Sequence, residues 1–219
     1  MRVFQRESKL RAINNPTVFL IRHGRTDFNK DNDTESRLKG TKFDLPLTAE
    51  GHEEAKKAAS VLADYPIADV KHSDMLRASQ TARHISDAVG VESTKDTHFD
   101  PWDVGYLSGH TRADAERRIE YYINHPDKAV PEGEPYGDWH SEYEQGLTKE
   151  MKLSEGHPGK ARVVVSHSCN AMATKAIVRG DDPQFYGEGG EKPGHITKLE
   201  KRGGQWQMSN MEIPDAVSV

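Results

Sequence analysis

The sequence has very little cysteine and no long apolar run. Its single cysteine, Cys169, allows neither an internal disulfide nor a cysteine-rich zinc site, which is typical of a reducing compartment. No stretch approaches the ~18 consecutive apolar residues of a membrane helix, and residues 1–16 contain no apolar segment of the kind found in secretory signals. We therefore expect a cytoplasmic protein with no membrane partner. Residues 1–16 match no motif.

The chain also lacks an excess of charge of either sign. It has 30 Lys and Arg residues against 35 Asp and Glu residues, a formal net charge of −5. Because no basic run exceeds two residues, we expect no nucleic-acid partner. Only 34% of the residues are hydrophobic, yet the low net charge argues against disorder. The core must therefore be built from a few short apolar runs.

Those runs alternate with helical patterns, which predicts an α/β fold. We expect one domain, residues 1–219, built as a three-layer sandwich in which helices flank a largely parallel central sheet. Thr48 is the expected cap of the first helix, and Ser73 that of the second. The predicted strands are 17–21, 67–71 and 161–165, the predicted helices are 48–65, 74–88 and 168–179, and the predicted hairpin pairs 195–199 with 205–208.

Two of the predicted strands end directly before a histidine. His23 follows the run TVFLI within Arg22-His23-Gly24, and His167 follows RVVVS. Open parallel sheets bind their ligands beyond the carboxyl ends of the strands. The sequence therefore predicts a site at this edge that contains both histidines.

Several motifs in order along the chain resemble the histidine phosphatase superfamily, also called the phosphoglycerate mutase-like family. RHGRT at residues 22–26 with Asn29 is similar to the RHGxTxxN signature of that family. The other matching segments are GTKFDLPLTAEG at 40–51, SDMLRASQTA at 73–82, PEGE at 131–134 and VVSH at 164–167.

Phosphoryl transfer needs fixed positive donors around the phosphate oxygens and an in-line nucleophile. The resemblance implies that His23 is the nucleophile and forms a phosphohistidine, and that Arg22, Arg77 and His167 form the phosphate pocket. Arginine binds phosphate through paired N–H groups, and the free N–H groups at the start of the Arg77 helix would add to the same site. No metal or other cofactor is expected, because the arginines supply the positive charge.

The resemblance further implies that Asn29 and Thr26 touch phosphate or substrate at the rim, and we include Gly24 and Ser168 among the substrate-binding residues. The partner is then a small phosphorylated molecule. Oligomeric state and substrate identity carry no sequence signal.

The general acid is not where the resemblance would place it. Many family members carry a glutamate four positions before the glycine that corresponds to Gly105, and here that position is Pro101. Asp103 is our preferred acid, because the neighbouring Trp102 would exclude water and raise its pKa. Asp100 and Glu134 are the alternatives.

Three functions are compatible with these residues. The first is a metal-independent phosphohydrolase acting on a small phosphomonoester. The second is a phosphoglycerate mutase-type phosphotransferase, ranked lower because the segment YLSGH after Gly105 does not resemble the mutase motif. The third, suggested by the missing glutamate, is a catalytically degenerate protein that only binds phosphate.

Substrate specificity is expected to lie in a helical cap formed by about residues 97–159, which are rich in charge and aromatics. Arg37, Lys39 and Arg112 would suit a substrate with a second anionic group.

Overall fold

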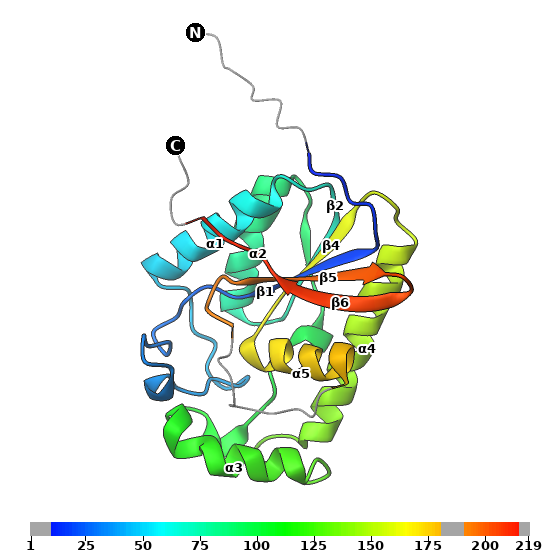
Figure 1. The fold of residues 1–219 in the computed structure, drawn as a ribbon. Coiled ribbons are helices and arrows are strands. Elements are labelled where there is room, and N and C mark those ends of the chain that lie inside the picture. Colours follow the sequence, from blue (N-terminus) through cyan, green and yellow to red (C-terminus); the bar gives the residue numbers. More distant parts are fainter. Residues whose placement is uncertain (1–9, 181–190, 215–219) are drawn as a thin grey trace.

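The computed structural model describes residues 10–180 and 191–214, and it is built around one six-stranded sheet (Figure 1). The strand order is β3-β2-β4-β1-β5-β6, with parallel pairing from β3 to β1 and antiparallel pairing of β5 and β6 at one edge. The strands are β1 (Thr17–Arg22), β2 (Ile67–His72), β3 (Ser93–Lys95), β4 (Ala161–Ser166), β5 (Ile196–Arg202) and β6 (Gln205–Asn210). The predicted strands and hairpin are confirmed, and the short edge strand β3 is an addition.

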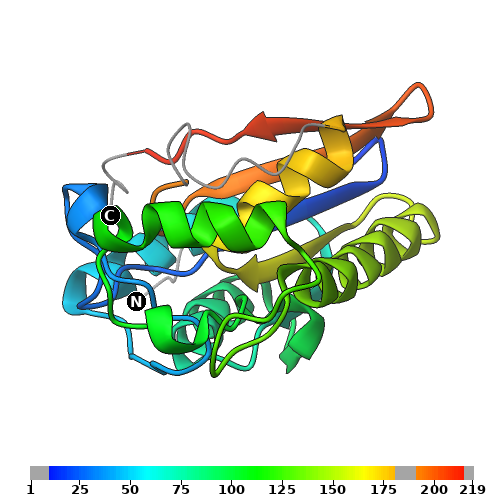
Figure 2. The same ribbon diagram turned by 90° about the horizontal axis from the view of Figure 1, so that it is seen from below.

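Helices cover both faces of this sheet because the central strands are buried on both sides. In β1, Val18 and Leu20 belong to one apolar cluster, whereas Phe19 and Ile21 belong to the other. The second cluster packs under α1 (Ala49–Leu62) and α2 (Leu76–Val89). The first packs under α4 (Tyr136–Glu155) and α5 (Ser168–Arg179). Figure 1 shows α1 and α2 on one side of the strands and α5 on the other, which are the three layers of the predicted α/β sandwich, and in Figure 2 α5 lies in front of the strands.

The helix α1 begins where the sequence predicts and ends earlier. The Thr48 side chain accepts a hydrogen bond from the Gly51 N–H at 3.0 Å, so Thr48 is the expected cap. We expected the helix to continue to residue 65, but its last residue is Leu62. Pro66 disfavours helical backbone in the residue before it, and Tyr65 instead packs its ring on Phe19 at 5.0 Å between centroids.

The helix α2 begins two residues later than expected and is not capped by Ser73. Met75 is the capping residue, and it makes no side-chain hydrogen bond. The Leu76 N–H donates to the Asp44 carboxylate at 2.6 Å, so a carboxylate already occupies the first turn that we expected to help bind phosphate. The other end is as predicted, because Gly90 adopts a left-handed φ of 71° that ends the helix.

The segment 97–159, expected as a helical cap, divides into two parts. Its first part contains the short 3₁₀ helices η2 (Thr97–Phe99) and η3 (Gly105–Leu107) and the helix α3 (Arg112–Asn124). Figure 1 shows α3 at one end of the molecule, beyond the carboxyl ends of β1 and β4. It lies close to η1 (Asp33–Glu35). The helix α4 instead contributes Tyr143 and Leu147 to the core beneath the sheet, so it belongs to the sandwich layer.

Within the described ranges, no helix is long and apolar enough to cross a membrane.

Candidate active site

The parallel pairing of β1 and β4 brings the two histidines together. Arg22 and Ser166 are partners at the end of this pairing, and the next backbone N–H, that of His23, donates to the Ser166 carbonyl at 3.0 Å. The rings of His23 and His167 lie 5.1 Å apart between centroids, and both residues are buried. The predicted site at the carboxyl edge of the sheet is therefore present in the fold.

A cavity opens at this edge, and most of the predicted site residues line it. Among the described residues, its wall combines cations, two imidazoles, small polar groups and an apolar side. The lining residues are Arg22, His23, Asn29, Ser36, Arg37, Leu38, Lys39, Gly40, Arg77, Pro101, Trp102, Val104, Arg112, His167, Ser168, Cys169 and Met172. Gly24, Thr26 and Asp103 are the predicted residues that this wall does not include.

One hydrogen bond sets the tautomer of His23. Its Nδ1 lies 2.7 Å from the Gly24 carbonyl oxygen, which can only accept, so Nδ1 carries the proton and Nε2 carries the lone pair. Burial lowers the pKa of His23 well below 6.5, and the charge of Arg77 lowers it further. His23 is therefore neutral near pH 7, with Nε2 as its unprotonated nitrogen.

His167 is bound on one side by a serine from a third strand end. Its Nε2 lies 2.7 Å from the Ser73 Oγ, just beyond β2, and within the described parts of the chain its buried Nδ1 has no hydrogen-bond partner. Burial and then Arg77 lower the pKa of His167 well below 6.5. From the sequence we expected Ser73 to cap a helix. The signal that could have placed it at the site is its position soon after a predicted strand, which it shares with His23 and His167.

Arg77 is held by backbone carbonyls rather than by a carboxylate. It is only 1% exposed, and it donates to the carbonyls of Phe43 at 3.0 Å and Gly40 at 3.1 Å. Burial lowers the pKa of Arg77 to about 10, which leaves it charged near pH 7. Its Nε is buried without a partner among the residues that the structure describes. Arg22, also buried, donates through Nη1 to the carbonyl of Glu191.

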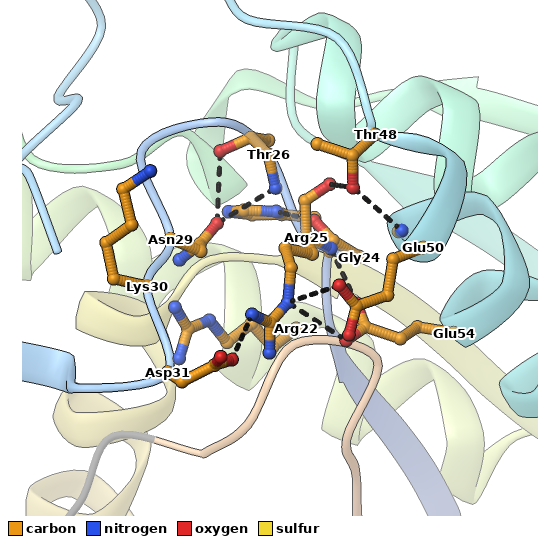
Figure 3. Close-up of polar contacts among 12 residues, drawn as sticks. Arg22, Gly24, Arg25, Thr26, Asn29, Lys30, Asp31, Thr48, Glu50 and Glu54 are labelled. Carbon is orange, nitrogen blue, oxygen red and sulfur yellow. Dashed lines mark hydrogen bonds and ion pairs between the residues drawn. The ribbon is translucent and has the colours of Figure 1, made fainter.

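The loop after His23 is fixed by its own side chains (Figure 3). The backbone N–H of Thr26 and its hydroxyl both donate to Asn29 Oδ1, at 3.1 and 3.0 Å, and Lys39 Nζ approaches the same oxygen at 3.2 Å. Because Oδ1 accepts from all of these groups, the amide NH₂ of Asn29 is the part left to face a ligand at the cavity wall. Thr26 is buried and acts through Asn29, so it does not itself touch the cavity.

Gly24 is required for close packing. A Cβ atom there would lie 2.2 Å from the carbonyl oxygen of Gly51, and its N–H donates to Thr81 Oγ1 at 3.1 Å. Arg25 binds this loop further to α1, since its N–H donates to Glu54 at 2.6 Å (Figure 3). Gly24, which we predicted to bind substrate, therefore joins the His23 loop to the start of α1 instead.

The three carboxylates considered as general acids are engaged elsewhere. Asp103 Oδ1 accepts from the Gly105 N–H at 3.0 Å, while Glu134 Oε1 accepts from the Asp103 N–H at 2.9 Å. Asp100 Oδ1 accepts from the Asp74 N–H at 2.7 Å. Burial raises the pKa of Asp100 and that of Glu134, but neither residue lines the cavity. This geometry gives Asp103 a place in a turn and does not support our preference for it as the acid.

Trp102 also lies differently from the expectation. Its indole N–H donates to the Glu134 carbonyl at 3.1 Å, and its ring packs on Tyr136 and Trp139. The residue thus forms part of the apolar wall and anchors the segment to α4, rather than shielding the Asp103 carboxylate.

Comparisons with known proteins show the family of this chain. The model of the histidine phosphatase superfamily (branch 1) matches residues 18–214. A protein of Enterobacter sp. named "Probable phosphoglycerate mutase GpmB" is 32% identical over 155 residues, which cover 68% of each chain. "Uncharacterized phosphatase PhoE" of Bacillus subtilis is 27% identical over 168 residues, covering 77% of this chain and 80% of the relative.

Solved structures show the same fold. A mycobacterial glucosyl-3-phosphoglycerate phosphatase has a TM-score of 0.71 at 23% identity, covering 89% of this chain and 97% of the other. A phosphoserine phosphatase of Entamoeba histolytica has a TM-score of 0.71 at 22% identity, with coverages of 90% and 96%. The chain belongs to the histidine phosphatase superfamily, in which catalysis through a phosphohistidine is typical.

The buried histidines predict that the folded protein loses stability in mild acid. His23 and His167 are neutral in the folded chain, whereas in the unfolded chain they bind protons below about pH 6.5. Protonation then favours the unfolded state, and each histidine contributes a slope of at most about 1.4 kcal/mol per pH unit to the free energy of unfolding. Urea unfolding in phosphate-free buffer, at several pH values between about 7.5 and 5.5, measures this slope.

His167→Gln is expected to reduce the slope, because it removes one of the two groups. His157, exposed near the end of α4, provides the matched control, and His157→Gln should leave the slope unchanged. Equal slopes for the wild type and His167→Gln would contradict the neutral, buried state of His167.

Proposed function

We propose that this protein is a metal-independent phosphohydrolase that acts on a small phosphorylated substrate through a phosphohistidine at His23. The observation that carries the proposal is the tautomer of His23, whose Nδ1 donates to the Gly24 carbonyl at 2.7 Å. That bond leaves the Nε2 lone pair for attack on phosphorus, in a cavity lined by Arg22 and Arg77.

The proposed reaction has two steps. His23 Nε2 attacks phosphorus as the bond to the leaving oxygen breaks, and the phosphoryl group is then carried by the imidazole. Water next attacks phosphorus, which releases inorganic phosphate and returns His23 as a neutral imidazole with its proton still on Nδ1. Because the imidazole departs neutral, this second step needs no proton donor to His23.

Buried donors would stabilise the transferred group in both steps. We assign the phosphoryl oxygens to the guanidinium groups of Arg22 and Arg77, the unpartnered Nδ1 of His167 and the amide of Asn29. Ser168, at the first turn of α5, adds a hydroxyl on the same wall. Arg77 donates to two backbone carbonyls, and its Nε is without a partner among the described residues, so a phosphate could accept from it.

Positive charge for the transition state comes from these side chains in this proposal. Across the described residues, no group of three or more His, Cys, Asp or Glu side chains is placed to hold a metal ion. The arginines and histidines of the cavity can perform the electrostatic work that a bound cation performs elsewhere.

The hydrolysis of p-nitrophenyl phosphate in the presence of EDTA tests the proposal. We expect turnover that EDTA leaves unchanged, and a fall in kcat/KM of at least about 10³-fold in His23→Ala, because the nucleophile is lost. His157→Ala is the matched control and should retain full activity.

The same experiment separates the other two functions. No turnover on a broad panel of phosphate esters, with inorganic phosphate still bound, would contradict the proposal and favour a phosphate-binding protein. Transfer of the phosphoryl group between positions of phosphoglycerate, without its release as phosphate, would favour the mutase.

We further propose that the substrate carries a second anionic group. Arg37 and Arg112 line the cavity, the first donating to the Gly109 carbonyl at 2.6 Å and the second to Ser168 Oγ at 3.2 Å. Lys39 lies on the same wall. A cation held in place in this way favours a charged substrate group over a neutral one.

Arg112→Ala is therefore expected to lower kcat/KM about tenfold or more for a bisphosphorylated substrate relative to a monophosphorylated one, as loss of a charge-assisted hydrogen bond does. Arg37→Ala should act in the same direction. Arg117, exposed on the same helix as Arg112, gives the control Arg117→Ala. Unchanged relative rates in both Arg37→Ala and Arg112→Ala would contradict the second anionic group.

A further inference from the structure

One stretch of the cavity wall is apolar. Pro101, Trp102 and Val104 form one stretch of its wall, and all the ionisable side chains that the described residues contribute are basic or neutral. The carboxylates nearest to this stretch in sequence, those of Asp100 and Asp103, accept hydrogen bonds from the backbone N–H groups of Asp74 and Gly105. Position 101, where the family resemblance places a proton donor, thus lies in an apolar stretch of the wall.

Three further cations line the same cavity. Arg37, Lys39 and Arg112 come from two segments that an isolated bridge between Arg37 and Thr111 joins, and the Arg112 N–H donates to the Ser36 carbonyl at 2.8 Å. Lys39 belongs with the histidines, since its Nζ lies 3.2 Å from Asn29 Oδ1 and its charge helps to lower the pKa of His23 and that of His167. Arg37 and Arg112 are the cations of this wall that are left for the group that departs.

The basicity of the leaving group decides whether such a site can work. An alkoxide is about as strong a base as hydroxide, so an alkyl phosphate needs a proton donor. A departing phosphate has a conjugate acid with a pKa of only about 6, and it leaves as a stable anion. Fixed cations stabilise such an anion directly, without a proton transfer.

We propose that the leaving group departs from this site as an unprotonated anion held by Arg37 and Arg112, and that the substrates are phosphoryl compounds with weakly basic, anionic leaving groups, as in an organic diphosphate. This inference rests on the proposed function. The bond from His23 Nε2 to the terminal phosphorus forms as the P–O–P bridge breaks, and the bridging oxygen leaves with its electron pair on the inner phosphate. Water then converts the phosphohistidine to inorganic phosphate.

A series of leaving groups tests the proposal. We would measure kcat/KM for substituted phenyl phosphates of increasing phenol pKa, for glycerol phosphate as an alkyl ester, and for an organic diphosphate. We expect a steep fall along the phenyl series, glycerol phosphate lower than p-nitrophenyl phosphate by about 10³-fold, and a diphosphate rate close to that of p-nitrophenyl phosphate. A flat series with glycerol phosphate within about tenfold of phenyl phosphate would overturn the proposal.

Variants of the carboxylates locate any hidden acid. Asp103→Asn, Asp100→Asn and Glu134→Gln are expected to leave the slope of the phenyl series and the alkyl-to-aryl ratio unchanged. A variant that slows glycerol phosphate at least tenfold more than p-nitrophenyl phosphate would identify its carboxylate as a general acid and would overturn the proposal.

A variant at position 101 would introduce a proton donor. Pro101→Glu is expected to raise the ratio of alkyl to aryl phosphate hydrolysis at least tenfold over the matched, non-acidic Pro101→Gln. This gain should disappear at high pH, where the introduced carboxyl group has lost its proton. Equal ratios in the two variants would contradict the inference that the proton donor missing at position 101 limits the departure of the leaving group.

These outcomes are distinguishable from failure of the proposed function. Hydrolysis that depends on His23 but is equally fast for alkyl and aryl esters overturns only the leaving-group inference. Hydrolysis that survives His23→Ala overturns the phosphohistidine function itself.

Discussion

The parallel pairing of β1 with β4 is the constraint on which the site depends. Its last contact, from the His23 N–H to the Ser166 carbonyl at 3.0 Å, continues the strand ladder into the segment that carries the nucleophile. Both strands are buried over their whole length, so a slip of one residue would exchange the side chains that pack in the two helical layers and break the packing of both. The burial that fixes the register thus also fixes the distance between His23 and His167.

The second constraint is electrostatic. The cavity holds buried arginines and two buried imidazoles, and a buried cation is costly unless its N–H groups are hydrogen-bonded. Backbone carbonyls of Gly40 and Phe43 satisfy part of Arg77, while its Nε and the Nδ1 of His167 are unpartnered among the described residues. A bound phosphate could accept hydrogen bonds from both of these nitrogens, so the cavity is suited to an anion.

The sequence predicted what depends on short-range pattern. The runs TVFLI and ARVVV predicted the central strands, because strands buried on both faces are continuously apolar. The histidines that follow them predicted the site, because parallel sheets bind ligands beyond the carboxyl ends of their strands. The surroundings of other residues depend on contacts that leave no periodic signal. Gly24 packs on Gly51, Ser73 contacts His167, and the Asp103 N–H donates to Glu134, each across a long stretch of chain. The segment that contains α4 is rich in charge and aromatics, which predicted a cap, whereas Tyr143 on this helix is fully buried under the sheet.

The central claim is that phosphoryl transfer passes through Nε2 of His23, and trapping the intermediate tests it most directly. Protein mixed with p-nitrophenyl phosphate would be quenched rapidly in base, which preserves phosphohistidine, then digested and analysed by mass spectrometry with site localisation. The account predicts one phosphoryl group on the peptide containing His23, stable in base and lost in acid, and absent from His23→Ala. Steady turnover with no phosphorylated His23, or with the phosphoryl group on another residue, would contradict it.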